Sequence, residues 1–170
     1  MNRASDAWSP AGSADVGIAS GLSGSVRRSL ESDTSRTLLA ATGVAVAYAV
    51  TARLGVALAF PGAPVSAVWF PNAILLAALL LAPRRSWWIY LAFVLPAHFL
   101  VQPLLVSVPL SRAVIGYFGN CATALLGATA LAALVPGIRR IDRLRTAVAF
   151  ILLAGVFAPL CTSVPVAAAF

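Results

Sequence analysis

Five apolar segments, each long enough to cross a bilayer, follow one another from residue 37 onward and constrain the fold more than any other feature. They cover residues 37–59, 65–82, 86–106, 112–134 and 146–170. At a rise of about 1.5 Å per residue, helices of about 18 to 25 residues cross the ~30 Å hydrocarbon core of a membrane. Because the segments lack the polar alternation of barrel strands, we predict an all-α, polytopic transmembrane helical bundle of about five spans.

The composition excludes a water-soluble domain. Hydrophobic residues make up 61% of the 170 positions and charged residues 10%, and the mean hydropathy is +0.94. Soluble domains carry about 25% charged residues. Residues 1–36 differ, because they are rich in Ser and Gly and hold 8 of the 17 charged residues (12 basic and 5 acidic). We therefore expect a disordered tail over residues 1–36, followed by a transmembrane domain over residues 37–170.

The arginines predict the orientation of the chain. All twelve basic residues are arginines, which in a soluble protein would suggest nucleic acid binding. Here they lie mostly between the apolar segments, where cytoplasmic loops retain positive charge. If the N-terminus is inside, Arg112 alone lies outside, and nine arginines are cytoplasmic: Arg27, Arg28, Arg36, Arg84, Arg85, Arg139, Arg140, Arg143 and Arg145. We expect a cytoplasmic N-terminus and no nucleic acid partner.

Polar side chains interrupt the apolar segments at a similar depth. Arg53, Asn72, His98 and Asn120 belong to the first four segments. At about 1.5 Å per residue, each lies about 9 to 12 Å from the outer end of its segment. A shared polar layer at that depth suits a small ligand entering from the periplasmic side. The alternative is a structural role, in which Arg53 reaches the outer headgroups and the other three make interhelical hydrogen bonds.

Pro71 lies next to this layer, between Trp69 and Asn72. A proline donates no backbone N–H, so it frees a carbonyl in the preceding turn. Freed backbone groups in a membrane helix either bind a ligand or accompany a kink. Pro71 therefore adds a little weight to the ligand-pocket interpretation.

Catalysis finds little support in the sequence. Beyond residue 36 the only carboxylate is Asp142, so neither an acid pair nor a Ser/His/Asp set can be assembled. One histidine and two dispersed cysteines, Cys121 and Cys161, do not provide a metal or haem site. We expect no enzyme activity, no metal and no cofactor in this chain.

Val-Trp-Phe-Pro-Asn at residues 68–72 and Arg-Arg-Ser-Trp-Trp at residues 84–88 are two of several ordered motifs in the sequence. Together these motifs resemble those of MASE1, a membrane-associated sensor domain of bacterial signalling proteins. The run from Pro64 to Ala82, which contains Val-Trp-Phe-Pro-Asn, is similar to the second span of that family, and Arg84-Arg85-Ser-Trp-Trp is similar to the following turn. Similar motifs are Ala-Arg-Leu-Gly at residues 52–55, Gly-Asn at residues 119–120 and the start of the fifth segment at Arg143. The resemblance covers about residues 37–170.

The resemblance implies a multi-helix sensory module of the bacterial inner membrane, normally coupled to a cytoplasmic histidine kinase or cyclic-di-GMP output domain. It supplies no catalytic residue, but it supports Arg53, Trp69, Pro71, Asn72 and Asn120 as sensor-core positions. The family's domain is longer and the last segment has no polar stop, so we expect this chain to be the amino-terminal part. Expected partners are the lipid bilayer, a small periplasmic ligand, and a second copy or another membrane protein.

Two other interpretations remain open at this point. A small multi-pass transport or channel subunit would use the polar layer to line a pathway. A non-functional remnant would explain the apolar end at Phe170.

The predicted orientation can be tested with reporter fusions. We expect reporters at Arg85 and Arg140 to behave as cytoplasmic and a reporter at Gly62 to behave as external, because positively charged loops stay inside. Alkaline phosphatase and green fluorescent protein fusions at each position measure this. The opposite pattern would overturn the orientation and the outward placement of the polar layer.

Overall fold

The computed structural model describes the backbone of residues 13–58, 69–105, 107–135 and 143–168, and the side chains of residues 33–58, 69–104, 107–135 and 143–164. Every regular element within those residues is helical, as predicted. The chain divides into two compact units, residues 1–38 and residues 39–170. Each unit is described by itself.

Helix α1 (Ser13–Ala57) begins well before the first predicted span. The structure assigns helix to residues 13–36 of the expected tail, and residues 1–12 lie outside the described part; the disorder of the tail stays a prediction. That prediction rested on the small apolar surface of the tail, which limits tertiary packing but not local helix formation. No proline interrupts the sequence between Pro10 and Pro61, so backbone hydrogen bonding can continue through the segment.

Four of the described helical segments are long and apolar enough to cross a membrane. They are Asp33–Ala57, Arg84–Leu104, Leu110–Leu134 and Leu144–Val164. Helix α2 (Pro71–Leu81) is apolar but has 11 residues, or about 16 Å of helix, which is less than the ~30 Å core. The expected second span over residues 65–82 is thus shorter than predicted among the described residues, and residues 65–68 lie outside them.

A tight turn connects α2 to the next helices. After Pro83, the 3-10 turn η1 (Arg84–Ser86) leads into α3 (Trp87–Phe99). Ser86 closes the turn, since its Oγ donates to the Pro83 carbonyl at 2.8 Å. The Arg84 guanidinium lies 5.7 Å from the ring centre of Trp87, within cation–π range. The turn thus combines charge with aromatic surface, as membrane interfaces do.

Two π-helical segments widen the later helices. The first, η2 (Leu100–Leu105), follows α3 and contains Pro103. The second, η3 (Ile151–Phe157), joins α5 (Leu144–Phe150) to α6 (Ala158–Ala168), with Pro159 just after it. Proline donates no amide hydrogen, so the regular helical ladder is interrupted at or beside both segments.

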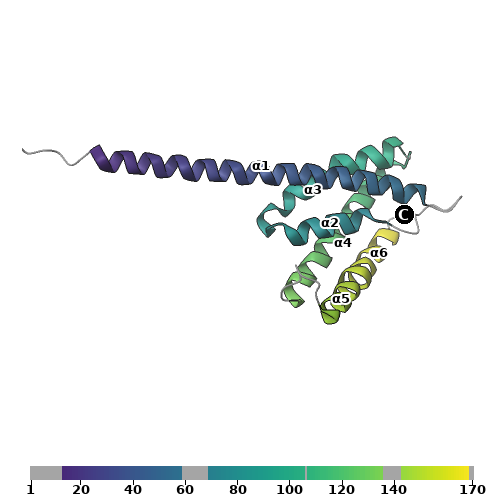
Figure 1. Cartoon of the computed structure of the whole chain (residues 1–170). Coiled ribbons are helices and arrows are strands. Elements are labelled where there is room, and N and C mark those ends of the chain that lie inside the picture. The colour runs from purple at the N-terminus through teal and green to yellow at the C-terminus, as the bar shows by residue number, and fades with distance from the viewer. Residues whose placement is uncertain (1–12, 59–68, 106, 136–142, 169–170) are drawn as a thin grey trace, which may run out of the picture. The chain divides into compact units, whose positions relative to one another are not determined.

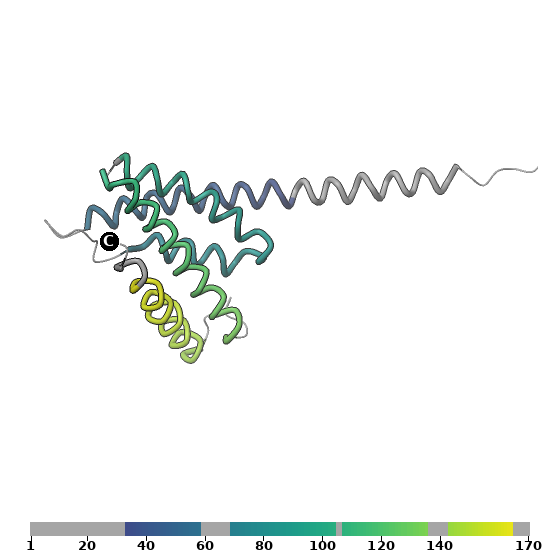
Figure 2. The backbone as a smooth tube through the Cα atoms, turned by 180° about the vertical axis from the view of Figure 1, so that it is seen from behind, coloured from purple at the N-terminus to yellow at the C-terminus, as the bar shows by residue number. Residues whose placement is uncertain are grey.

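Helix α4 (Leu110–Leu134) is the central element of the 39–170 unit. It packs beside α2 on one side and beside η3 and α6 on the other (Figure 1 and Figure 2). Gly127 permits the close approach, because a Cβ there would lie 3.3 Å from Leu76 Cδ1 and 3.7 Å from Ala154. The hydroxyls of Thr123 and Thr162 are 2.6 Å apart and join α4 to α6.

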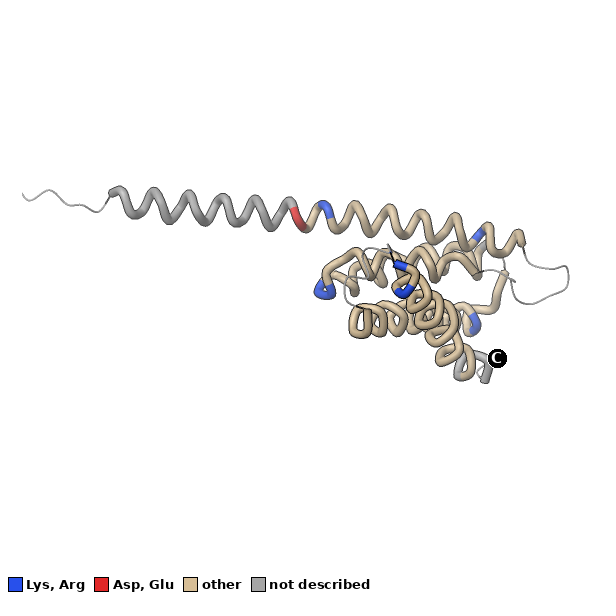
Figure 3. The backbone as a smooth tube through the Cα atoms, turned by 60° about the horizontal axis from the view of Figure 1, so that its bottom comes forward, with Lys and Arg blue, Asp and Glu red and all other residues tan. Residues whose placement is uncertain are grey.

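Charged residues are scarce in this unit and lie toward the ends of its helices, as Figure 3 shows. Many large apolar side chains are exposed instead. Along η3 and α6, Ile151 is 60% exposed and Leu160 61%. A surface of this kind suits a helix that faces lipid, so the unit has the character of a multi-pass membrane domain.

Candidate functional site

The buried hydroxyl of Tyr48 connects three helices. Tyr48 lies on α1 and is fully buried, and His98 on α3 is 1% exposed. The Tyr48 hydroxyl lies 3.0 Å from His98 Nδ1, and Asn120 on α4 donates from Nδ2 to the same hydroxyl at 2.8 Å. We refer to Tyr48, His98 and Asn120 as the interhelical network.

The hydrogen bonds of the network run in one direction. His98 Nε2 lies 3.0 Å from the Ala113 carbonyl, which only accepts, so Nε2 carries a hydrogen. In a neutral imidazole Nδ1 then accepts, and its donor is the Tyr48 hydroxyl. The Tyr48 oxygen in turn accepts from Asn120. Each of these polar groups therefore has a partner of the correct kind, and a network satisfied in this way fixes the relative positions of the helices.

Aromatic rings surround the imidazole. The ring centres of Phe99 and Tyr117 lie 5.7 and 5.8 Å from that of His98, both in edge-on geometry. Tyr117 is anchored to α3, because its hydroxyl donates to the Leu91 carbonyl at 2.9 Å. Gly116 lies beside the imidazole, and a Cβ there would be in ordinary van der Waals contact with His98 at 3.9 Å. The setting is apolar and uncharged, which strengthens the hydrogen bonds of the network.

Small residues on α1 let Tyr48 reach its partners. Ala41, Tyr48, Ala52 and Gly55 are buried and share one face of the helix. The opposite face exposes Val46, Val50 and Leu54, each more than half exposed. The contact face of α1 thus carries one large side chain, and the hydroxyl of that side chain makes the interhelical bonds.

Trp69 and Asn72, at the start of α2, form a second polar feature. The indole Nε1 of Trp69 and the Oδ1 of Asn72 are buried and have no hydrogen-bond partner. Pro71 is fully buried between them and begins the helix, where its missing N–H costs no helical hydrogen bond. One atom is a donor and the other an acceptor, so the pair has unused hydrogen-bonding capacity of both kinds.

The structure separates the predicted sensor-core residues into two groups and a single residue. His98 and Asn120 come together through Tyr48. Trp69, Pro71 and Asn72 adjoin at the start of α2. Arg53 is exposed on α1 and has no hydrogen bond in either group among the described residues. Their function in a sensor core stays a prediction.

Tyr48 was missed by the sequence analysis, although a signal was present. A hydroxyl in the middle of an apolar span needs a partner for the same reason as an amide or imidazole. The tyrosine was overlooked because its ring suits an apolar helix and hides the polar atom.

Metal binding would require His, Cys, Asp or Glu side chains that lie close together. The described residues contain no group of three such side chains placed to hold a metal ion. Cys121 and Cys161 are both free thiols. What the site does hold is a set of hydrogen bonds that links helices and a polar pair that can accept new ones.

Comparison with known proteins gives one result. The family model MASE1 matches residues 39–170 of the chain. No curated protein and no solved structure matches. The matched range coincides with the helical unit that contains the interhelical network and the Trp69–Asn72 pair.

Replacing Tyr48 should weaken the packing of α1. We expect Tyr48→Phe to lower the free energy of unfolding by about 1 kcal/mol, because membrane-embedded hydrogen bonds contribute on that order. Unfolding in mixed micelles measures the change. Tyr90→Phe is the matched control, since Tyr90 is buried but its hydroxyl makes no hydrogen bond within the described residues. Equal stability of the two variants would contradict the network.

Proposed function

We propose that this chain, which belongs to the MASE1 family of membrane-associated sensor domains, detects a signal in the outer half of the membrane and transmits it as a change in the packing of α1. The observation that carries the proposal is the interhelical network. It attaches α1 to α3 and α4 through the single hydroxyl of Tyr48.

Physical considerations make this attachment a suitable switch. Between apolar helices in lipid, the hydrophobic effect provides no net drive, so packing and interhelical hydrogen bonds determine association. Each such bond contributes about 1 kcal/mol, which a bound ligand can match. Some ligands or lipid states would bind better to an arrangement in which Tyr48 no longer bonds to His98 and Asn120. Such a ligand or lipid state would shift the population of helix arrangements toward that one.

The proposed setting is the bacterial inner membrane, with a cytoplasmic N-terminus. The distribution of arginines supports this orientation, because it leaves most positive charge inside. The proposed output is a cytoplasmic histidine kinase or cyclic-di-GMP domain that reads the arrangement of the helices, while this chain itself performs no catalysis. The exposed apolar face of α1 around Val46 and Val50 supports a second copy or another membrane protein as partner.

The proposal can be tested in a chimera that joins a diguanylate cyclase output domain to the cytoplasmic N-terminus of this chain, because an odd number of spans leaves residue 170 outside. Loss of about 1 kcal/mol at Tyr48 changes a two-state equilibrium by about fivefold, since 1.4 kcal/mol is a factor of ten. We therefore expect Tyr48→Phe and Asn120→Leu to change basal cyclic-di-GMP in cells by about three- to fivefold. The Tyr90→Phe chimera should match the parent.

Membrane insertion of each chimera is checked by fractionation. Unchanged cyclic-di-GMP in both network variants, with normal insertion, would refute the sensor mechanism. A solute flux through proteoliposomes that contain the chain would instead identify a transport subunit.

A further inference from the structure

Within the described residues, the Trp69–Asn72 pair holds the buried side-chain polar atoms that make no hydrogen bond. These atoms are Trp69 Nε1 and Asn72 Oδ1. Buried donors and acceptors are nearly always paired, because leaving one unpaired costs free energy. An unpaired donor and an unpaired acceptor three positions apart therefore require an explanation.

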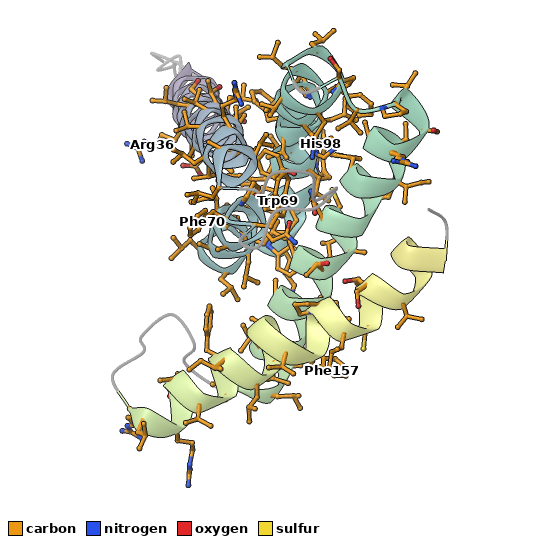
Figure 4. All side chains as sticks on the ribbon, turned by 90° about the vertical axis from the view of Figure 1, so that its right-hand side faces the viewer. Arg36, Trp69, Phe70, His98 and Phe157 are labelled. Atoms are coloured by element: carbon orange, nitrogen blue, oxygen red, sulfur yellow. The ribbon has the colours of Figure 1, made fainter. Side chains whose placement is uncertain are left out.

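The two residues flank the start of α2, with Trp69 just before its N-cap residue and Asn72 in its first turn. Phe70 between them already has helical dihedral angles, φ −64° and ψ −29°. The polar atoms of Trp69 and Asn72 are both buried, so both side chains point into the protein. Phe70 is 41% exposed, whereas Trp69 packs against the buried core, as Figure 4 shows. The pair therefore faces the interior of the helical unit.

The residues around the Trp69–Asn72 pair indicate whether a bound ligand would be charged. The buried polar or charged residues of the described chain are Ser86 and His98, and neither is an ion pair partner. Arg53 is exposed, and the described residues of the 39–170 unit contain no carboxylate. A charged ligand group would lose its hydration without gaining a countercharge, so an uncharged group is favoured.

The two atoms select the chemistry of that group. It must accept a hydrogen bond from the Trp69 N–H and donate one to the Asn72 oxygen, as a hydroxyl or a primary amide does. Leu75 and Leu76 follow Asn72 on the same face and are buried. An apolar body would suit these neighbours.

We propose that Trp69 and Asn72 form the binding site of a small uncharged molecule that carries a hydroxyl or amide group on an apolar body. The inference rests on the proposed sensor function and names its ligand class. Pro71, which lies between the two residues in sequence, starts the helix without an N–H of its own and is fully buried.

The probe for the test is hexanamide, with hexanoate and hexylammonium as charged molecules of the same length. The protein is placed in phosphatidylcholine vesicles, whose lipids carry no hydroxyl or amide that could occupy the site and which add no tryptophan. A variant with Trp8→Phe, Trp87→Phe and Trp88→Phe leaves Trp69 as the single tryptophan. Its fluorescence then reports on the site alone.

We expect hexanamide to change the Trp69 emission saturably, and the charged probes to have no saturable effect. Asn72→Leu should weaken the apparent affinity for hexanamide about tenfold, the factor expected for one lost hydrogen bond. Without a probe, Asn72→Leu should leave thermal stability unchanged or raised, because it removes an unpaired acceptor. The matched control keeps Trp88 as the single tryptophan, since Trp88 is 66% exposed.

Three results would overturn the site. A non-saturable change that is equal for Trp69 and Trp88 would mean partition of hexanamide into lipid. Equal binding of hexanoate or hexylammonium would refute the uncharged class. A less stable Asn72→Leu variant with no probe response would mean that the pair holds structural water only. Because binding is measured without an output domain, failure here leaves the cyclic-di-GMP test of the sensor intact, and the reverse also holds.

Discussion

The absence of water from the hydrocarbon core requires every polar group of a membrane helix to find a partner inside the protein. The rest of this structure depends on how that requirement is met at Tyr48. The hydroxyl donates to His98 Nδ1 and accepts from Asn120. His98 in turn donates from Nε2 to the Ala113 carbonyl. Four residues on α1, α3 and α4 thereby satisfy one another. Because apolar contacts between helices gain little over contacts with lipid, these bonds give α1 a defined position.

The sequence was sufficient for the class of fold and for parts of the site. Apolar runs predicted the long helices from α1 to α6, and the isolated His98 and Asn120 were recognised as polar groups in need of partners. Depth along a helix follows from counting residues, but direction around the bundle does not. Depth alone placed Arg53 with His98 and Asn120, whereas in the structure Arg53 is exposed on α1. The α1 residue that bonds to His98 and Asn120 is Tyr48.

Other differences come from contacts or local rules that periodicity does not capture. Helix α2 begins at Pro71 and ends before the Ala82–Pro83 turn. The hydropathy of residues 65–82 does not reveal either of these ends. The bond from His98 to Ala113 connects residues on either side of the π-helical segment η2 and the non-helical residues 107–109, a geometry that a regular helix count misses. The helix over residues 13–36 reflects uninterrupted backbone bonding in a polar sequence.

The two polar features have opposite characters, and this contrast gives the MASE1 unit a physical basis for sensing. The residues of the interhelical network are hydrogen-bonded to one another and join helices, whereas Trp69 Nε1 and Asn72 Oδ1 have no hydrogen-bond partner. Helix α4 connects the regions, because it contributes Asn120 to the network and packs along α2, which Asn72 helps to begin. A change in the position of α2 can therefore reach Tyr48 on α1 through the packing of α2 against α4 and the hydrogen bond from Asn120.

The central claim is the directed bond from Tyr48 to His98, and His98 is the only histidine of the chain. Selective ¹⁵N labelling of histidine therefore gives one pair of ring signals, which solid-state NMR in lipid bilayers can assign. The account predicts a neutral ring with hydrogen on Nε2 and an accepting Nδ1, whose signal shifts in Tyr48→Phe. A ring with hydrogen on Nδ1, or a charged imidazolium, would contradict the directed bond. So would an Nδ1 signal that does not change in Tyr48→Phe.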